Sequence, residues 1–165
     1  MRRKDKEHNR KPSPSGIKAL SFRGFQPASI SSSHAKRASS HSDTKHEVLL
    51  RSELWRMGLR FRKNVRTLPG KPDLVFPRAR TVVFCDGDFW HGRNWRTLRM
   101  KLQKGTNASY WLAKIKSNRK RDLRNTKLLK KAGWQVIRLW ESDIKKDPSA
   151  AALYVKQVVD TRRGF

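Results

Sequence analysis

Three acids and a histidine that could do chemistry lie in one short stretch of the sequence, Leu68–His91. Asp73 opens an apolar run behind a Pro-Gly turn, and a second apolar run ends in Asp86 and Asp88, just before His91. The chain has only 13 acids, so this grouping favours a site over acids that merely flank strands in solvent. Carboxylates at the ends of adjacent strands suit a hard divalent cation, because such ions prefer oxygen ligands.

The two apolar runs predict a metal site if they pair as a hairpin, because Asp73 would then lie near Cys85 and Asp86. Two carboxylates, or one carboxylate and a strand carbonyl, could hold Mg²⁺ there. A cation in that position would polarise a phosphodiester and lower the pKa of a bound water, which is the chemistry of a metal-dependent nuclease.

His91 is the candidate general base, since it is the only histidine outside the first fifty residues. A neutral imidazole beside a bound water can take its proton. Asp122, on the inward face of a predicted helix, could orient the imidazole as carboxylates do in catalytic triads. A structural histidine, and an ion pair between Asp122 and a neighbouring Arg or Lys, are the alternatives that the sequence leaves open.

The elements that should position these residues follow a mixed α/β order. A capping box at Thr44 and Glu47 predicts a helix that ends at Gly58. A meander of strands, followed by a helical crossover to one more strand, predicts a mixed sheet flanked by helices, with the strand at 81–85 in its centre. The expected segments are strands at 59–61, 73–76, 81–85 and 134–140, a loop at 92–106, and helices at 108–132 and from 148 onward.

The long predicted helix should turn one face inward, at positions spaced by four and three. That face mixes apolar residues with polar ones: Trp111, Ile115, Asn118, Asp122, Asn125 and Leu129. Three other tryptophans are expected in the core: Trp55, Trp134 and Trp140. The aromatic residues nearest the acids could stack on bases or wedge a base step apart, with core packing as the alternative: Phe89, Trp90 and Trp111.

The charge of the chain indicates a polyanionic partner. The 165 residues include 40 Lys and Arg, and the formal net charge is +27. Such an excess destabilises a compact state unless an anion binds, and nucleic acid is the commonest partner of this kind. No apolar run approaches the roughly 20 residues of a membrane span, and no secretory signal is expected. A single cysteine fits a reducing compartment, so we expect a cytoplasmic, nucleoid-associated protein.

Composition divides the chain into two parts. Residues 1–42 are poor in apolar residues and rich in Ser, Lys, Arg and His, which is typical of a flexible basic arm. Residues 43–165 should form the endonuclease domain, which is long enough to bury its own core. The basic run Lys114–Lys131 favours phosphate contact over a merely solvated helix face.

Several motifs in order resemble the very short patch repair endonuclease family: PGKPD, VFCDGDFWH, YWLAKI, NRKRD and GWQVIRLWE. The resemblance covers the chain from about Ser33 to the C-terminal helix. It implies a restriction-endonuclease-like fold and a magnesium-dependent nickase that acts on double-stranded DNA at thymine–guanine mismatches. The expected product ends are a 5′-phosphate and a 3′-hydroxyl.

The resemblance assigns roles to the matching positions. It implies that Asp73 is the metal-binding aspartate and that Cys85 lends its backbone carbonyl to magnesium. His91 matches the catalytic histidine and Asp122 matches its acidic partner, while Glu47 matches an acid of the first helix near the site. The candidate DNA contacts are Phe89, Trp90, Trp111, Lys36, Arg37, Asn118, Arg119 and Lys120.

The chain departs from the family at its zinc site. Family members carry a structural zinc held by three cysteines and a histidine, whereas this chain has other residues at the matching positions: Asp88, Arg93, Trp95 and Ser142. These are not a plausible ligand set, so we predict a branch without structural zinc. Asp86 stands where the repair enzymes have a second histidine, and it could serve as an extra magnesium ligand.

Two other functions stay open from the sequence. The chain could be a non-catalytic DNA-binding subunit of a defence or mobile-element complex, and the lost zinc ligands and basic arm favour that reading. It could also be a ribosomal or RNA-scaffold protein, which would explain the charge but not the grouped acids. Repair or defence proteins are the expected protein partners.

Overall fold

A four-stranded mixed sheet is the centre of the computed structural model, which describes residues 43–164. β2 pairs antiparallel with β1 and with β3, whereas β3 and β4 are parallel. The predicted hairpin, the central position of β3 and the crossover to a parallel strand are therefore confirmed. The spatial order of the strands is β1 (Arg62–Lys63), β2 (Leu74–Phe76), β3 (Thr81–Asp86) and β4 (Gln135–Trp140).

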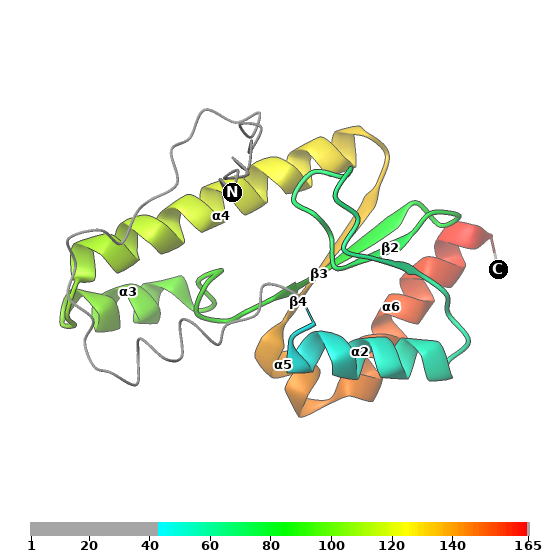
Figure 1. Cartoon of the computed structure of the whole chain (residues 1–165), viewed down its shortest axis with the longest axis horizontal. Coiled ribbons are helices and arrows are strands. Elements are labelled where there is room, and N and C mark those ends of the chain that lie inside the picture. Colours follow the sequence, from blue (N-terminus) through cyan, green and yellow to red (C-terminus); the bar gives the residue numbers. More distant parts are fainter. Residues whose placement is uncertain (1–42, 165) are drawn as a thin grey trace, which may run out of the picture.

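Helices cover both faces of this sheet (Figure 1). The long helix α4 (Ala108–Lys131) lies on one face. The opposite face is covered by α2 (Lys45–Arg56), α5 (Glu141–Lys146) and α6 (Pro148–Arg163). Within residues 43–164, no helix has the length and apolar composition needed to cross a bilayer. The predicted arm at 1–42, with Lys36 and Arg37, lies outside the described residues.

The expected loop at 92–106 is wrong, because the structure has a helix there, α3 (Trp95–Gln103). It packs along the first half of α4, away from the sheet (Figure 1). Its half-buried side chains recur at helical spacing: Trp95, Leu98 and Leu102. None of the helix is fully buried, and its many cations make the segment polar on average. The short helix α5, which directly follows β4, also has no counterpart in the expected elements.

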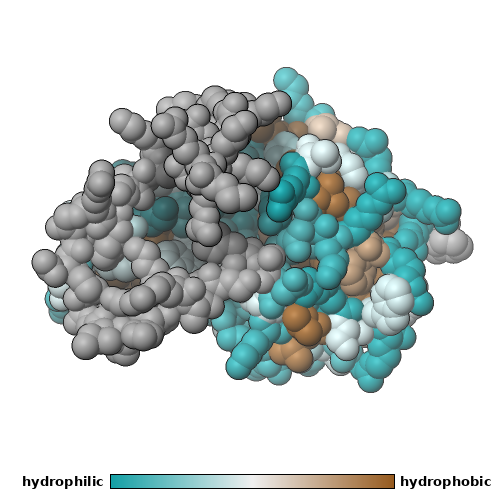
Figure 2. Space-filling model, in the orientation of Figure 1, coloured by the Kyte–Doolittle hydropathy of each residue, from teal (hydrophilic) through white to brown (hydrophobic). Residues whose placement is uncertain are grey.

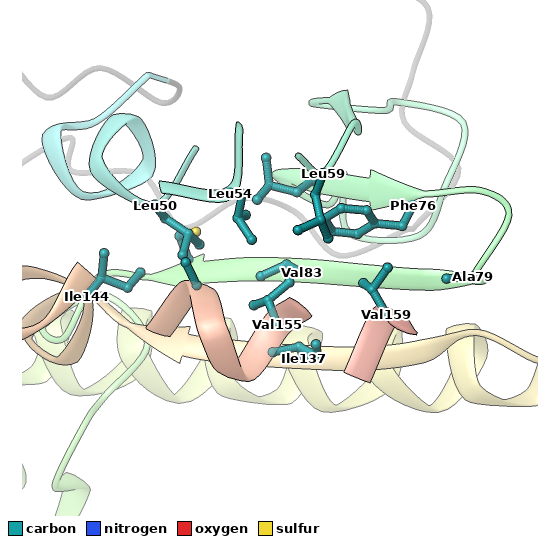
Figure 3. Packing of buried hydrophobic residues seen from close by; sticks show 13 residues of the cluster. Leu50, Leu54, Leu59, Phe76, Ala79, Val83, Ile137, Ile144, Val155 and Val159 are labelled. Atoms are coloured by element: carbon teal, nitrogen blue, oxygen red, sulfur yellow. The ribbon is translucent and has the colours of Figure 1, made fainter. Parts of the chain in front are cut away.

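The pleat of the strands divides their side chains between two cores. Towards α2 and α6 the sheet contributes Leu74, Phe76, Val83, Cys85 and Ile137 (Figure 3). Towards α4 it contributes Val75, Val82 and Phe84, with the half-buried Val136. Asp86 follows Phe84 by two positions and Arg138 follows Val136 by two. The same alternation therefore points both charged side chains towards α4.

Trp55 is not a core residue, contrary to expectation. Its side chain is 58% exposed, and the guanidinium carbon of Arg60 lies 3.7 Å from its ring centroid. The inward stripe of α2 runs through Leu50 and Leu54, and Trp55 lies one position further around the helix. Trp134 does pack against the core on the α4 side, as expected, and Trp140 is half-buried.

Candidate active site

Asp73 stands one residue before β2, at the end of the sheet where β3 finishes. Its Oδ2 accepts a 2.7 Å hydrogen bond from the backbone N–H of Cys85. Its own N–H donates to the carbonyl of Val83 at 3.0 Å. The hairpin thus brings the carboxylate beside Cys85, as the strand pairing predicts.

The surroundings of Asp73 fit a bound cation. Burial raises the pKa of Asp73 to about 6, against the opposing effect of the Cys85 hydrogen bond, and the charges of Glu47 and Asp86 contribute to the rise. A buried carboxylate with acidic neighbours is more stable as an anion when a cation compensates its charge. Mg²⁺ is often held by one or two carboxylates and several waters, so Asp73 with a nearby carbonyl is a suitable donor set.

Cys85 could contribute to such a site only through its backbone. Its side chain is buried in the core on the α2 and α6 side of the sheet. Burial, with the charges of Asp73, Glu47 and Asp86, raises the pKa of the Cys85 thiol well above its ordinary value. The thiol therefore stays protonated at neutral pH and is a poor metal ligand.

Glu47 is held in the first turn of α2 and is only 5% exposed. Its Oε2 accepts from the backbone N–H of Asp43 at 3.0 Å, and its Oε1 accepts from the hydroxyl of Thr44 at 2.7 Å. The helix begins where the capping box predicts, but the box itself does not form: Glu47 bonds the N–H of Asp43, one residue before the N-cap, and the Thr44 hydroxyl bonds that carboxylate and caps no helix N–H. Glu47 lies close enough to Asp73 to raise its pKa, so it belongs to the same acidic group.

His91 and Asp122 form a close pair, with 2.6 Å between Nδ1 and Oδ2. Burial disfavours the Asp122 anion, but the hydrogen bond with His91 and the charges of His91, Arg138 and Arg121 together lower the pKa of Asp122. Asp122 is therefore an anion that fixes Nδ1 of the imidazole. Nε2 of His91 makes no hydrogen bond with a residue in 43–164, so it is available to accept a proton.

Arg138 on β4 contacts two acids of the site, Asp86 and Asp122, and the sequence pattern does not predict it as a site residue. Its Nε and Nη2 each lie 2.6 Å from one oxygen of Asp86. Its Nη2 is also 3.5 Å from Nδ1 of His91 and 3.5 Å from Oδ2 of Asp122. The sequence does contain a signal for this role. Arg138 lies inside the apolar run WQVIRLW, and a charged side chain in the interior of a sheet needs a partner of opposite charge.

Asp86 is paired with Arg138, which the sequence pattern does not predict. Both Asp86 oxygens bond the guanidinium, and the residue is only 3% exposed. Asp86 thus neutralises the half-buried Arg138 beside His91, and its role as a magnesium ligand stays a prediction. The strand register explains the pairing, since β3 and β4 run parallel and place the two side chains on the same face.

α4 also fixes the backbone that carries the histidine. Asn118 donates from Nδ2 to the carbonyl of Trp90 at 2.9 Å, and Arg119 donates from Nη1 to the carbonyl of Gly92 at 3.0 Å. Asn118 is only 8% exposed and holds the loop through this bond, so DNA contact by its side chain stays a prediction. Arg119 and Lys120 remain exposed, and DNA contact by them stays a prediction.

Phe89, Trp90 and Trp111 form one aromatic cluster. Their ring centroids lie 5.3 Å apart for Phe89 and Trp90, 5.4 Å for Phe89 and Trp111, and 5.8 Å for Trp90 and Trp111. Phe89 is 37% exposed. The fold therefore brings the three aromatic residues expected to contact DNA together, next to His91 in the chain.

An arginine-centred network occupies positions that match zinc ligands in the resembled family. Nη2 of Arg93 lies 2.8 Å from Oδ1 of Asp143, and its Nη1 bonds the hydroxyl of Ser142. Nη1 is also 3.8 Å from Asp88, whose Oδ1 accepts from the N–H of Ser142 at 3.4 Å. Within residues 43–164, no group of three or more His, Cys, Asp or Glu could hold a metal ion. The absence of structural zinc stays a prediction.

Known proteins resemble the chain over most of this fold. A profile of the DNA mismatch endonuclease Vsr family matches residues 25–97. The type II nicking enzyme V.NmeDIP of Neisseria meningitidis serogroup C is 41% identical over 122 residues, which is 74% of this chain and 81% of that protein. The type II nicking enzyme V.HpaIIP of Haemophilus parainfluenzae is 37% identical over 127 residues, 77% of this chain and 89% of that protein.

The DNA mismatch endonuclease Vsr of Escherichia coli is 37% identical over 109 residues, 66% of this chain and 68% of that protein. The family match includes β1, β2, β3 and the loop that carries His91. The chain therefore belongs to the DNA mismatch endonuclease Vsr family, and it is a DNA endonuclease with a restriction-endonuclease-like fold.

Proposed function

We propose that the protein is a magnesium-dependent nickase that cuts one strand of double-stranded DNA at a thymine–guanine mismatch during repair. The observation that carries the proposal is the grouping of Asp73, the His91–Asp122 pair and the aromatic cluster at one end of the sheet. The names of relatives support it, since two are nicking enzymes and a third is a mismatch endonuclease. An intact histidine–aspartate pair weighs against the non-catalytic alternative.

Asp73 and the backbone carbonyl of Cys85 are the groups that would hold magnesium. When bound, the ion polarises the scissile phosphate and lowers the pKa of the attacking water. The raised pKa of Asp73 supports this role, because a buried acid among acids favours a cation nearby. Glu47, fixed by two hydrogen bonds, adds negative charge to the same place.

His91 would take the proton from the attacking water through Nε2. The 2.6 Å contact between Nδ1 and Asp122 keeps the ring in one orientation and stabilises the imidazolium that forms. The charge of Arg138, 3.5 Å from Nδ1, would oppose that imidazolium. Asp86 offsets this effect because it neutralises the guanidinium through both oxygens.

The aromatic cluster would lie against the mismatched step. Inserting an aromatic ring between bases requires unstacking, and that free-energy cost is smallest where pairing is already weak. Phe89 is the exposed member, and its ring packs edge-to-face against those of Trp90 and Trp111. A mismatch preference would then arise from the ease of opening the step.

The test is cleavage of duplexes labelled on either strand, one with a thymine–guanine mismatch and one fully paired. With magnesium, the protein should cut one strand of the mismatched duplex, leave a 5′-phosphate and a 3′-hydroxyl, and cut the paired duplex far more slowly. Equal cutting of both duplexes would refute the mismatch preference. Cutting of both strands would refute nicking, and undiminished cutting in a chelator would refute the role of magnesium.

A further inference from the structure

A basic groove of about 530 Å³ lies between the β1–β2 connection and the second half of α4. Its cationic side chains come from both walls: Arg66 and Lys71 from the connection, Arg121 and Arg124 from the helix. No acidic side chain lines it. The groove is thus a concave surface of one charge sign, which attracts anions.

The walls of this groove are fixed by close packing. A turn brings the N–H of Lys71 to the carbonyl of Leu68 at 3.1 Å, with Pro69 and Gly70 at its centre. Gly70 has φ +80°, and a β-carbon there would lie 2.9 Å from Nδ2 of Asn125 on α4. Only glycine allows the connection to approach the helix this closely, so the shape of the groove is built into the fold.

The cations of the groove are largely uncompensated. Arg66, Lys71 and Arg124 make no ion pair or side-chain hydrogen bond with any residue in 43–164. Arg121 is only 3.6 Å from Asp122, whose other oxygen holds His91. Cations gathered without acids repel one another, and an anion bound among them would relieve that repulsion.

Asn125 adds an uncharged hydrogen-bond donor to the lining of the groove. Its side chain is 8% exposed and lines the groove. It makes no hydrogen bond with a described residue, and its amide atoms are not among the fully buried atoms that lack a partner, so they are open to the groove. From this position the amide could donate a hydrogen bond to a phosphate oxygen of a bound strand.

The groove adjoins the catalytic centre. Lys71 precedes Asp73 by two residues, and Arg121 is the neighbour of Asp122. Along α4, Asp122 lies between Trp111 and Arg124, which are about 20 Å apart at 1.5 Å per residue. A DNA strand that passes the aromatic cluster and then the catalytic pair would continue into the groove.

We propose that this groove binds backbone phosphates of the cleaved strand, on the side of the scissile bond away from the aromatic cluster. The proposal rests on the proposed function, since it takes Asp73 and His91 as the position of the scissile phosphate. The groove anchors the strand by charge and by the Asn125 amide. It carries no base-reading role, because phosphates are the same at every step.

The first test measures binding of a fluorescent mismatched duplex without magnesium, so cleavage plays no part. Arg66→Ala and Arg124→Ala should each weaken binding about three- to tenfold, and the double variant should reduce the slope of log K against log salt by about two. Arg78→Ala is the matched control: an exposed arginine in the β2–β3 turn, at the far end of those strands. Groove variants that bind like Arg78→Ala overturn the proposal.

The second test locates the contact on the DNA. Single phosphates of the cleaved strand are replaced by neutral methylphosphonates, and affinity is measured for the wild-type protein and for Arg124→Ala. At the contacted phosphate, the replacement should weaken the wild-type protein and leave Arg124→Ala almost unchanged. Equal losses for both proteins at every position would exclude a phosphate contact by this arginine.

The role of the buried amide has its own variant. Asn125→Asp keeps the side-chain shape and adds a negative charge, so it should weaken DNA binding more than Asn125→Ala does. Because Asn125 is buried, the melting temperature of each variant is measured first, and the exposed arginine variants carry the test if the aspartate variant does not fold. Equal binding by both folded Asn125 variants counts against an amide–phosphate bond.

The outcomes separate the groove from the proposed function. If the protein does not cleave DNA but Arg66→Ala and Arg124→Ala weaken DNA binding, the phosphate-binding role of the groove is supported and the proposed reaction is refuted. If the protein nicks mismatched DNA but those variants leave the affinity and the salt slope unchanged, the proposed reaction is supported and the phosphate-binding role of the groove is refuted.

Discussion

At the scale of single residues, Nδ1 of His91 lies among charges of both signs. Asp122 is 2.6 Å from this atom, and Arg138 is 3.5 Å from it. Asp86 pairs both of its oxygens with Arg138 and also lies 3.5 Å from Nδ1. The base of the proposed reaction therefore depends on residues of three different elements, β3, β4 and α4.

Asp122→Asn should reduce kcat by about 10²–10⁴-fold, the range for loss of general base catalysis. The amide can still bond Nδ1, but it no longer stabilises the imidazolium. DNA affinity should change little, because Asp122 faces His91 and not the surface. Single-turnover cleavage and equilibrium binding, measured on the same duplex, check this split. A loss confined to affinity would contradict the role of Asp122.

Asp73→Asn should stabilise the metal-free protein at alkaline pH. The folded protein raises the pKa of Asp73 from 3.8 to about 6, so it binds this proton more tightly than the unfolded chain does. Stability linked to this group is therefore full below about pH 4 and is lost as the pH rises through about 6. The asparagine variant should avoid that loss and gain on the order of 1–2 kcal/mol at pH 8, with little gain at pH 4.

Urea unfolding in a chelating buffer at the two pH values measures this difference. Asn118→Ala is a useful comparison, because it removes a loop contact and no titrating group. A gain for Asp73→Asn that is the same at both pH values would show that burial of the Asp73 charge is not its cause.

At the scale of elements, α4 is the part that orders the site. Its middle turns supply Asp122 to the histidine and Asn118 to the carbonyl of Trp90, while Trp111 at its start completes the aromatic cluster. The Arg93 network fixes the same loop from the other side, through Ser142 and Asp143 of α5. The loop that carries His91 is thus held between two helices.

Arg93→Ala should loosen this loop without unfolding the protein. Hydrogen exchange of residues 88–95 should become faster, and the cleavage rate should fall, because His91 is then less well placed. Lys146→Ala, an exposed cation at the end of α5, is the control. Exchange in 88–95 that matches the control would show that the network does not hold the loop.

Metal analysis tests the predicted absence of structural zinc. Protein purified without chelators should contain no stoichiometric zinc, and its melting temperature should not fall when a zinc chelator is added. Arg93 already ties the loop to α5 by its ion pair with Asp143. One bound zinc per chain, lost together with stability on chelation, would refute the prediction.

The sequence predicts those parts of the fold and the site that depend on local periodicity. The inward face of α4 follows from spacing, and Ile115, Asn118, Asn125 and Leu129 are indeed buried there. The pairing of Asp86 with Arg138 depends on the parallel register of β3 and β4, which no local pattern encodes. α3 escapes prediction because its cations make the segment polar on average, although its apolar residues recur at helical spacing.

At the scale of the whole molecule, charge and aromatic contacts have separate tasks. Figure 2 shows a face on which hydrophilic side chains surround isolated hydrophobic patches. The net charge of +27 supplies attraction to any duplex. The aromatic cluster is the feature that could distinguish one base step from another, because bases differ in how easily they unstack.

Phe89→Ala should therefore reduce discrimination more than overall binding. Affinity for a mismatched duplex should fall by about 1–3 kcal/mol, the range for loss of base stacking, while affinity for a paired duplex changes less. Competition binding with the two duplexes at one salt concentration measures both values. Leu123→Ala, an exposed apolar residue elsewhere on α4, is the control. Equal losses on both duplexes would contradict a wedge at the mismatch.

The most direct test of the account compares single-turnover cleavage of a thymine–guanine duplex by the wild-type protein and by Asp73→Ala, with magnesium and with all DNA bound. We predict a nick by the wild-type protein, none by Asp73→Ala, and comparable DNA binding by both. Cleavage by Asp73→Ala at the wild-type rate would show that the metal centre and reaction assigned to this end of the sheet are wrong.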